Sequence, residues 1–262
     1  MKADVFSVDG KKEKSIELPA VFGEEVRTDL ITRAVLHENS LELQPKGAYK
    51  LAGLQTTAHM RGRKEAYRAI KNKGISRLPR ERLPKGRFGK VKIVPFAVGG
   101  RRAHPPNPEK LLVELMNRKE YQKALRSAIA ATADSALVKA RGHRFAGNVP
   151  LVVDDSFESL SKTKDVEAAF EKMGLGADLE RASNGAKKKS GVRKMRKGGV
   201  RRPRSILVVV KDGTKIAKAA RNLPGVDVCT LKGLQARLLA PGCAPGRLAV
   251  WSESVVKELG SW

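Results

Sequence analysis

The sequence contains little cysteine and no long apolar run. Its two cysteines, Cys229 and Cys243, form no C-x-x-C pair, and no nearby histidine could complete a zinc site. Two cysteines are too few for a disulfide framework, so we expect reduced thiols in a cytoplasmic protein. The longest strongly apolar run, ILVVV at 206–210, is far too short to cross a bilayer, and the N-terminal MKADVFSVDGKKEK has no apolar stretch typical of an export signal. We therefore expect neither a membrane protein nor a secreted disulfide-rich protein.

The sequence also lacks the motifs of nucleotide-binding and catalytic proteins. No G-x-G-x-x-G or G-x-x-x-x-G-K-[ST] motif follows a predicted strand, so we expect no cofactor. Asp154 and Asp155 end a predicted strand, where α/β enzymes can hold Mg²⁺ or a catalytic acid, but no second acidic cluster accompanies them. We expect these acids to cap a turn or a helix. The histidines are too far apart for a metal or catalytic set: His37, His59, His104 and His143.

Acidic residues are scarce relative to basic ones, and the imbalance is local. The formal net charge is +26, from 53 Lys and Arg against 27 Asp and Glu. Residues 46–104 hold 17 basic and 2 acidic side chains, and residues 186–204 hold 10 basic and none acidic. The remaining 184 residues are nearly neutral, with 26 basic and 25 acidic side chains. We expect a near-neutral globule with two basic segments, whose partner is a polyanion.

The C-terminal half alternates predicted strands and helices. Strands are expected at 150–155, 205–210, 226–231 and 247–252, and helices at 161–174, 214–223, 232–239 and 252–259. Thr163 can cap the first of these helices, and Gly174 suits the left-handed position after it. This alternation predicts an α/β fold with a mostly parallel central sheet between layers of helices. Residues 4–8 could add an edge strand.

The basic segment 46–104 is expected to be an extended loop inserted between helices. A helix is predicted at 24–43, and Asn107 with Pro108 forms a good N-cap and first-turn pair for a helical region that runs with breaks to Gly142. We therefore predict a globular body of 1–45 and 105–262, a basic RNA-binding loop at 46–104, and a second basic segment at 186–204.

The composition of the insertion favours RNA as the polyanion. It has 15 large apolar or aromatic residues in 59, too few to offset a backbone entropy cost of about 1–2 kcal/mol per residue, so alone it should be disordered. Arginine gives bidentate contacts to phosphate, and Tyr67 and Phe88 could stack on unpaired bases. A solvated charge run is the simpler alternative, but this run is internal and interrupted by Gly and Pro. Ala66, Tyr67 and Ile70 could equally form the face of a short helix.

Several motifs resemble one known family. They are LAGLQTTAHMRGR, RLPRERLPKGRFGK, VGGRRAHPP, RKMRKGGVRRPRSILVVV, AARNLPGVDV and LAPGCAPGRLAVWSES, and they occur in the family's order over essentially the whole chain. Together they closely resemble the archaeal branch of the universal large-subunit ribosomal protein four family. The resemblance implies a three-layer α/β/α body and a long loop that threads through ribosomal RNA and lines the constriction of the nascent-peptide exit tunnel. Where family members commonly have His, this chain has Ala244.

The resemblance also implies which residues contact RNA and which partners are present. The loop tip is expected near 71–80, beside the nascent peptide, and the other partners are large-subunit ribosomal RNA and neighbouring ribosomal proteins in the cytoplasmic ribosome. Neither a membrane nor a second copy of the chain is expected as a partner. The RNA-binding residues so implied are Arg61, Arg63, Arg77, Arg80, Arg82, Lys85, Arg87, Lys90, Arg101, Arg102, His104, Lys194, Arg196, Lys197, Arg201, Arg202 and Arg204.

The leading hypothesis is a structural ribosomal protein without catalytic activity that staples RNA segments together. The alternative from another class is an RNA-modifying or RNA-cleaving enzyme that uses Asp154 and Asp155 with Mg²⁺. A general DNA-binding protein is a weaker alternative.

Overall fold

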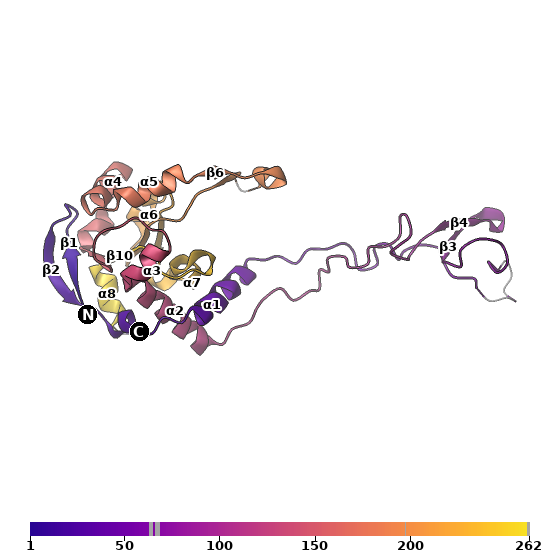
Figure 1. Ribbon diagram of the computed structural model, residues 1–262, viewed down its shortest axis with the longest axis horizontal. Helices are drawn as coiled ribbons and strands as arrows, with labels where there is room; N and C mark the ends of the chain where they lie inside the picture. The colour runs from indigo at the N-terminus through magenta and orange to yellow at the C-terminus, as the bar shows by residue number, and fades with distance from the viewer. Residues whose placement is uncertain (63–64, 66–68, 197, 261–262) are drawn as a thin grey trace. The chain divides into compact units, whose positions relative to one another are not determined.

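The computed structural model describes residues 1–62, 65, 69–196 and 198–260. The chain falls into two compact units, which are described separately below (Figure 1). One unit, called the body, comprises residues 1–42 and 113–262. The other, called the insertion unit, comprises residues 43–112 and contains the whole of the first basic segment, 46–104.

The described part of the body is built on a six-stranded sheet. The strand order is β2 (Lys12–Glu17), β1 (Lys2–Phe6), β5 (Leu151–Val153), β10 (Ala249–Ser252), β8 (Leu207–Val210) and β9 (Asp227–Thr230). Strands β1 to β9 in this order are parallel, and only β2 pairs antiparallel, with β1. The mostly parallel sheet predicted from the alternating pattern is confirmed.

The side chains of the central strands alternate between two apolar cores. In β8, Leu207 and Val209 belong to one core, and Val208 and Val210 belong to the other. This separation follows from the period of two in a strand, which sends successive side chains to opposite faces. Every residue of β8 is buried because both faces are covered, which explains why its sequence is continuously apolar.

Helices cover both faces of the sheet (Figure 1). The first core contains residues of α1 (Thr28–Leu41), α2 (Arg118–Ala133), α7 (Ala236–Leu239) and α8 (Glu253–Leu259). The second contains residues of α3 (Ser135–Ala140), α4 (Thr163–Lys172), α5 (Gly176–Asn184) and α6 (Thr214–Ala220). The body is therefore a three-layer α/β/α structure, as predicted.

Several local predictions were wrong. Residues 4–8 were expected at the sheet edge, but β1 lies between β2 and β5, and the edge strand β2 was not predicted. Thr163 was expected to cap α4, but it is the first residue of that helix, and no side chain caps it. Gly174 does take the left-handed conformation expected of it, with φ of +78°.

The helix predicted to begin at Asn107 is also absent from the described residues. The Oδ1 atom of Asn107 accepts a hydrogen bond from the Glu109 backbone N at 3.0 Å, so the capping geometry forms a turn. The next helix, α2, begins only at Arg118. Two of the large apolar side chains between them are not buried, since Leu111 is 93% exposed and Leu115 is 86% exposed. Without a buried face, a short helix is not stable.

The described part of the insertion unit has one short hairpin, β3 (Arg80–Arg82) with β4 (Phe88–Val91), and otherwise turns and extended chain. Among its described apolar residues, only Ala58 and Ile70 are buried. The two ends of the unit run side by side: a Cβ added to Gly47 would lie 2.4 Å from the Pro106 carbonyl oxygen, and one added to Gly53 would lie 2.8 Å from Arg101 Cβ. The absence of side chains at these two glycines allows this close approach.

Candidate nucleic-acid interface

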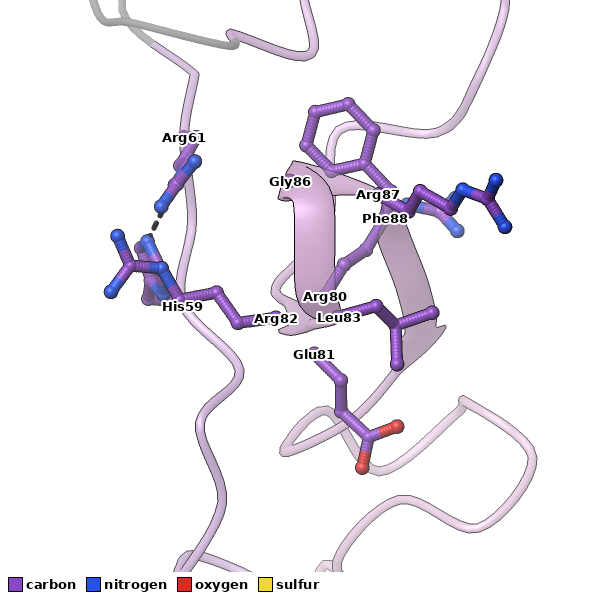
Figure 2. A pocket seen from close by; sticks show the side chains of 9 residues that line it. All are labelled: His59, Arg61, Arg80, Glu81, Arg82, Leu83, Gly86, Arg87 and Phe88. Carbon is purple, nitrogen blue, oxygen red and sulfur yellow. Dashed lines mark hydrogen bonds between the residues drawn. The ribbon is translucent and has the colours of Figure 1, made fainter.

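The β3–β4 hairpin carries a small pocket with a strongly basic wall. Its volume is about 230 Å³. Figure 2 shows the side chains that line it, four arginines and a histidine against a single acid: His59, Arg61, Arg80, Glu81, Arg82, Leu83, Gly86, Arg87 and Phe88. The pocket therefore concentrates positive charge at a concave surface, which is what an anionic ligand requires.

The local sequence explains the shape of the hairpin. Lys85 and Gly86 both have positive φ, +56° and +71°, and reverse the chain between the strands. The Leu83 backbone N donates to the Arg87 carbonyl oxygen at 3.3 Å and closes the turn. A third segment joins through a bridge between His59 and Arg80. The arginines at alternating positions 80 and 82 are thus held on backbone paired with two other segments.

Hydrogen bonds orient two of the pocket arginines. Arg61 Nε donates to His59 Nε2 at 2.7 Å, and the other ring nitrogen of His59 lies 3.1 Å from the Thr57 carbonyl oxygen. This pattern fits the neutral tautomer with the proton on Nδ1. Arg80 Nη2 donates to Ser76 Oγ at 2.7 Å. Arg80 Nε is buried and has no partner among the described residues, so this donor is available to an added acceptor.

Most of the described cations of the insertion unit have no carboxylate partner. Within the described residues, its ion pairs are Lys50 with Glu109 at 3.2 Å and Lys92 with Glu81 at 3.9 Å. Arg61, Arg80 and Arg101 are half-buried, and Arg63 lies outside the described residues. The other predicted RNA-binding residues of the unit are exposed: Arg77, Arg82, Lys85, Arg87, Lys90, Arg102 and His104.

One aromatic side chain lies among these cations. Phe88 is half-buried, and Lys73 Nζ lies 5.0 Å from its ring centroid. The other aromatic residue proposed for base stacking, Tyr67, lies outside the described residues, as does Ala66.

The second basic segment is a short hairpin within the body. Strand β6 (Lys187–Lys188) pairs antiparallel with β7 (Val200–Arg201), and a 3-10 turn, Gly191–Met195, lies between them. The predicted residues Lys194, Arg196, Arg201 and Arg202 are exposed, whereas Lys197 lies outside the described residues. Arg204 is exposed too, but its Nη1 donates to both carboxylate oxygens of Asp227, at 2.7 and 3.0 Å. Its charge is therefore partly neutralised within the protein.

Comparison with known proteins identifies the family of the chain. The model of the ribosomal protein L4/L1 family matches residues 16–262. The chain belongs to this family. The chain is 52% identical over 260 residues to the large ribosomal subunit protein uL4 of Methanocaldococcus jannaschii, covering 99% of this chain and 98% of the relative. It is 46% identical over 262 residues to the protein of the same name from Archaeoglobus fulgidus, covering 100% of this chain and 99% of the relative.

Membership of the L4/L1 family confirms the resemblance found in the sequence, including its archaeal character. The matched relatives carry the names of ribosomal proteins rather than of enzymes. No described helix is long and apolar enough to span a membrane.

In this L4/L1 family chain, the two acids of the enzyme hypothesis act as caps. Asp154 Oδ2 accepts a hydrogen bond from the Ser156 backbone N at 3.2 Å. Asp155 Oδ1 accepts one from the Ser254 backbone N at 3.0 Å, in the first turn of α8, and its other oxygen bonds the Ser254 hydroxyl. The described residues contain no group of three or more His, Cys, Asp or Glu side chains that could hold a metal. Both acids have the capping role expected of them.

The histidines and cysteines also serve local structure. His143 is buried with its Nδ1 3.1 Å from Asp178 Oδ2, and His37 Nδ1 contacts the Glu114 carbonyl oxygen. Cys229 is buried in the first core, and burial raises the pKa of its thiol to about 12. Cys243 is half-buried, and both cysteines are free thiols.

Sequence reasoning missed a buried arginine at the point where the chain passes from the second basic segment into the sheet. Arg247 is 0% exposed, and its Nη2 donates to Asp227 Oδ2 at 2.6 Å. Its Nε donates to the carbonyl oxygen of Ser205 at 2.9 Å, two residues before β8 begins. Burial lowers the pKa of Arg247, and the ion pair with Asp227 opposes that effect. A basic residue just before an apolar strand, in an APGR turn, gave no local sign of burial.

Proposed function

We propose that this chain is a structural component of the large ribosomal subunit that binds ribosomal RNA through its insertion unit and its second basic segment. The body supplies the folded platform, and the two basic segments neutralise phosphates and hold RNA segments together. Neighbouring ribosomal proteins are the other partners, one copy of the chain acts per subunit, and the assembled particle is the cytoplasmic ribosome.

One observation carries this proposal: the β3–β4 hairpin presents several guanidinium groups that have no carboxylate partner among the described residues. Guanidinium groups match phosphate oxygens in a bidentate geometry. The unpartnered Nε of Arg80 is a further donor that an RNA oxygen would satisfy. Family membership supports RNA as the polyanion, because the matched relatives are named as proteins of the large ribosomal subunit.

The finer part of the proposal concerns the tip of the insertion. By resemblance to the family, residues near 71–80 line the constriction of the exit tunnel and lie beside the nascent peptide. The described residues of this stretch, including Lys73 and Arg77, are mostly exposed. A cationic, glycine-containing segment suits a surface in contact with both RNA and a passing peptide.

Sedimentation of the tagged protein from lysate tests the proposal. We expect stoichiometric co-migration with large subunits that persists in high salt. A variant with Arg80, Arg82 and Arg87 replaced by Gln should be incorporated less, because three phosphate contacts are lost at one hairpin. A matched control replaces three exposed lysines of the body, Lys164, Lys215 and Lys218, by Gln. Protein that remains at the top of the gradient, or equal incorporation of both variants, would contradict the proposal.

A further inference from the structure

The body contains a second basic pocket where the second basic segment meets α3, α5 and the turn at Pro241–Cys243. Its volume is about 1030 Å³, at the upper end of the range for ligand sites. No Asp or Glu is among the described residues that line it. Its cationic lining residues are Arg141, Arg181, Lys189, Arg201, Arg202 and Arg204.

Two carboxylates lie close to this pocket, and both are already engaged. Asp178 pairs with His143 and with Arg181, whose Nε lies 2.8 Å from Asp178 Oδ1. Asp227 pairs with Arg204 and with the buried Arg247. The charges that remain in the pocket wall therefore have no counter-charge among the described residues.

Arg141 is the clearest case of an uncompensated charge. Its Nη2 donates to the Pro241 carbonyl oxygen at 2.6 Å, but its Nη1 is buried and has no partner among the described residues. Burial, together with the neighbouring cations Arg247 and Arg181, lowers the pKa of Arg141 to about 10. A partly buried cation beside other cations is costly unless an anion lies near it.

We propose that this pocket binds a phosphodiester group of RNA, with Arg141, Arg201 and Arg202 supplying the compensating charge. The inference rests on the proposed function and extends it from the exposed basic segments into the body. Arginine favours phosphate over other anions because its planar donors match two phosphate oxygens at once. The volume fits a phosphate together with its flanking sugars rather than a lone ion.

The geometry also suggests why residues from several secondary-structure elements line the pocket. Arg181, on α5, donates through Nη2 to the Arg204 carbonyl oxygen at 2.8 Å, so the second basic segment is tied to the body at the pocket edge. A bound phosphate would bridge Arg141 of the body to Arg201 and Arg202 of that segment. RNA binding would then fix the segment against the body.

Two variants of the full chain test the pocket. Arg141→Gln removes the uncompensated charge, and Arg202→Gln removes an exposed charge from the same wall without disturbing packing. Lys139→Gln, an exposed lysine on α3 outside the pocket, is the matched control. Binding to large-subunit ribosomal RNA is measured over a range of salt concentrations, and thermal stability is measured in phosphate, sulfate and chloride at equal ionic strength.

We expect each pocket variant to bind RNA about 10-fold more weakly and to lower the log-log salt slope by about one, because one phosphate contact is lost. Lys139→Gln should change neither quantity. If RNA affinity and salt slope are unchanged in both pocket variants while the unaltered protein binds normally, the proposal that the pocket binds RNA is wrong. The proposed function would still stand. Phosphate or sulfate stabilisation that Arg141→Gln abolishes without any effect on RNA binding would mean a site for small free anions, and would overturn it as well. Failure of the unaltered protein to bind RNA would instead count against the proposed function.

Discussion

Asp178 shows how single charges hold the body together. Its side chain is 0% exposed and accepts hydrogen bonds from the Arg144 backbone N, at 3.0 Å, and from Arg181, with His143 Nδ1 at 3.1 Å. Burial raises the pKa of Asp178, but hydrogen bonds from His143 and Arg181 outweigh it and lower the pKa from 3.8 to about 2. A depressed pKa means that the carboxylate stabilises the fold above pH ~4 and that this contribution is lost as the pH falls towards ~2.

The first prediction follows from this pKa. Asp178→Asn should destabilise the body by about 2 kcal/mol at pH 6, the free energy that corresponds to the shift. Protonated Asp and Asn are similar in shape and charge, so the difference in free energy of unfolding between the unaltered protein and the variant should disappear as the pH approaches 2. Urea unfolding of both proteins from pH 6 to pH 2 measures it. A gap that stays constant over this range would show that the carboxylate charge plays no part.

At this scale the sequence predicted the exposed cations but not the buried charges. The basic residues of the insertion stand out because no acid accompanies them in the sequence. Asp178 and Arg247 have no such signal, since their partners, His143 and Asp227, lie 35 and 20 residues away. Only the fold brings those groups together.

Among the secondary-structure elements, α1 and α7 are joined by one buried side chain. Glu38 on α1 accepts hydrogen bonds from the Ala236 and Arg237 backbone N atoms, at 2.7 and 2.8 Å, and from the Tyr121 hydroxyl at 2.5 Å. The two backbone donors lie at the start of α7, where a helix leaves N–H groups unpaired. Burial is the main cause of the raised pKa of Tyr121, and the hydrogen bond to Glu38 raises it as well.

The second prediction concerns this link. Glu38→Ala should lower the free energy of unfolding by about 3 kcal/mol, because it leaves buried donors at α7 and Tyr121 without an acceptor. Tyr121→Phe removes only one of these bonds and should cost about 1 kcal/mol. Chemical denaturation of both variants provides the comparison. Equal effects of the two substitutions would mean that the capping of α7 contributes nothing.

Element types were predictable from the sequence where a periodic apolar pattern was long or continuous. β8 and α4 have such patterns, and their existence was predicted correctly. The pattern of β2 is KEKSIE, which has a single large apolar residue, Ile16, so the strand depends on pairing with β1 rather than on burial. The helix predicted to begin at Asn107 is absent for the opposite reason. The capping signal was present, but no apolar face followed that the body could bury.

For the whole molecule, the main feature is that the residues that form the folded cores and the residues that carry the excess positive charge lie in different segments of the chain. Among the described residues, the two apolar cores contain only body residues, and the insertion unit buries almost no apolar surface. A globular protein gains most of its stability from buried apolar surface. The insertion should therefore be dispensable for folding.

The third prediction tests that separation. Replacing residues 46–104 with a short glycine-serine linker should leave cooperative unfolding of the body intact, with a free energy of unfolding within about 1 kcal/mol of the full chain. A short linker suffices because residues at both ends of the insertion lie in contact at Gly47 and Pro106. Thermal denaturation by circular dichroism gives the result. A broad, non-cooperative transition would show that the insertion belongs to the folding unit.

The same deletion provides the most direct test of the account, through the salt dependence of RNA binding. Each phosphate neutralised by a Lys or Arg contributes roughly 0.7–0.9 to the slope of log affinity against log salt concentration. We predict a steep slope for the intact chain and a slope shallower by several units for the folded deletion protein with large-subunit ribosomal RNA. Equal slopes for the two proteins would contradict the assignment of RNA binding to the insertion.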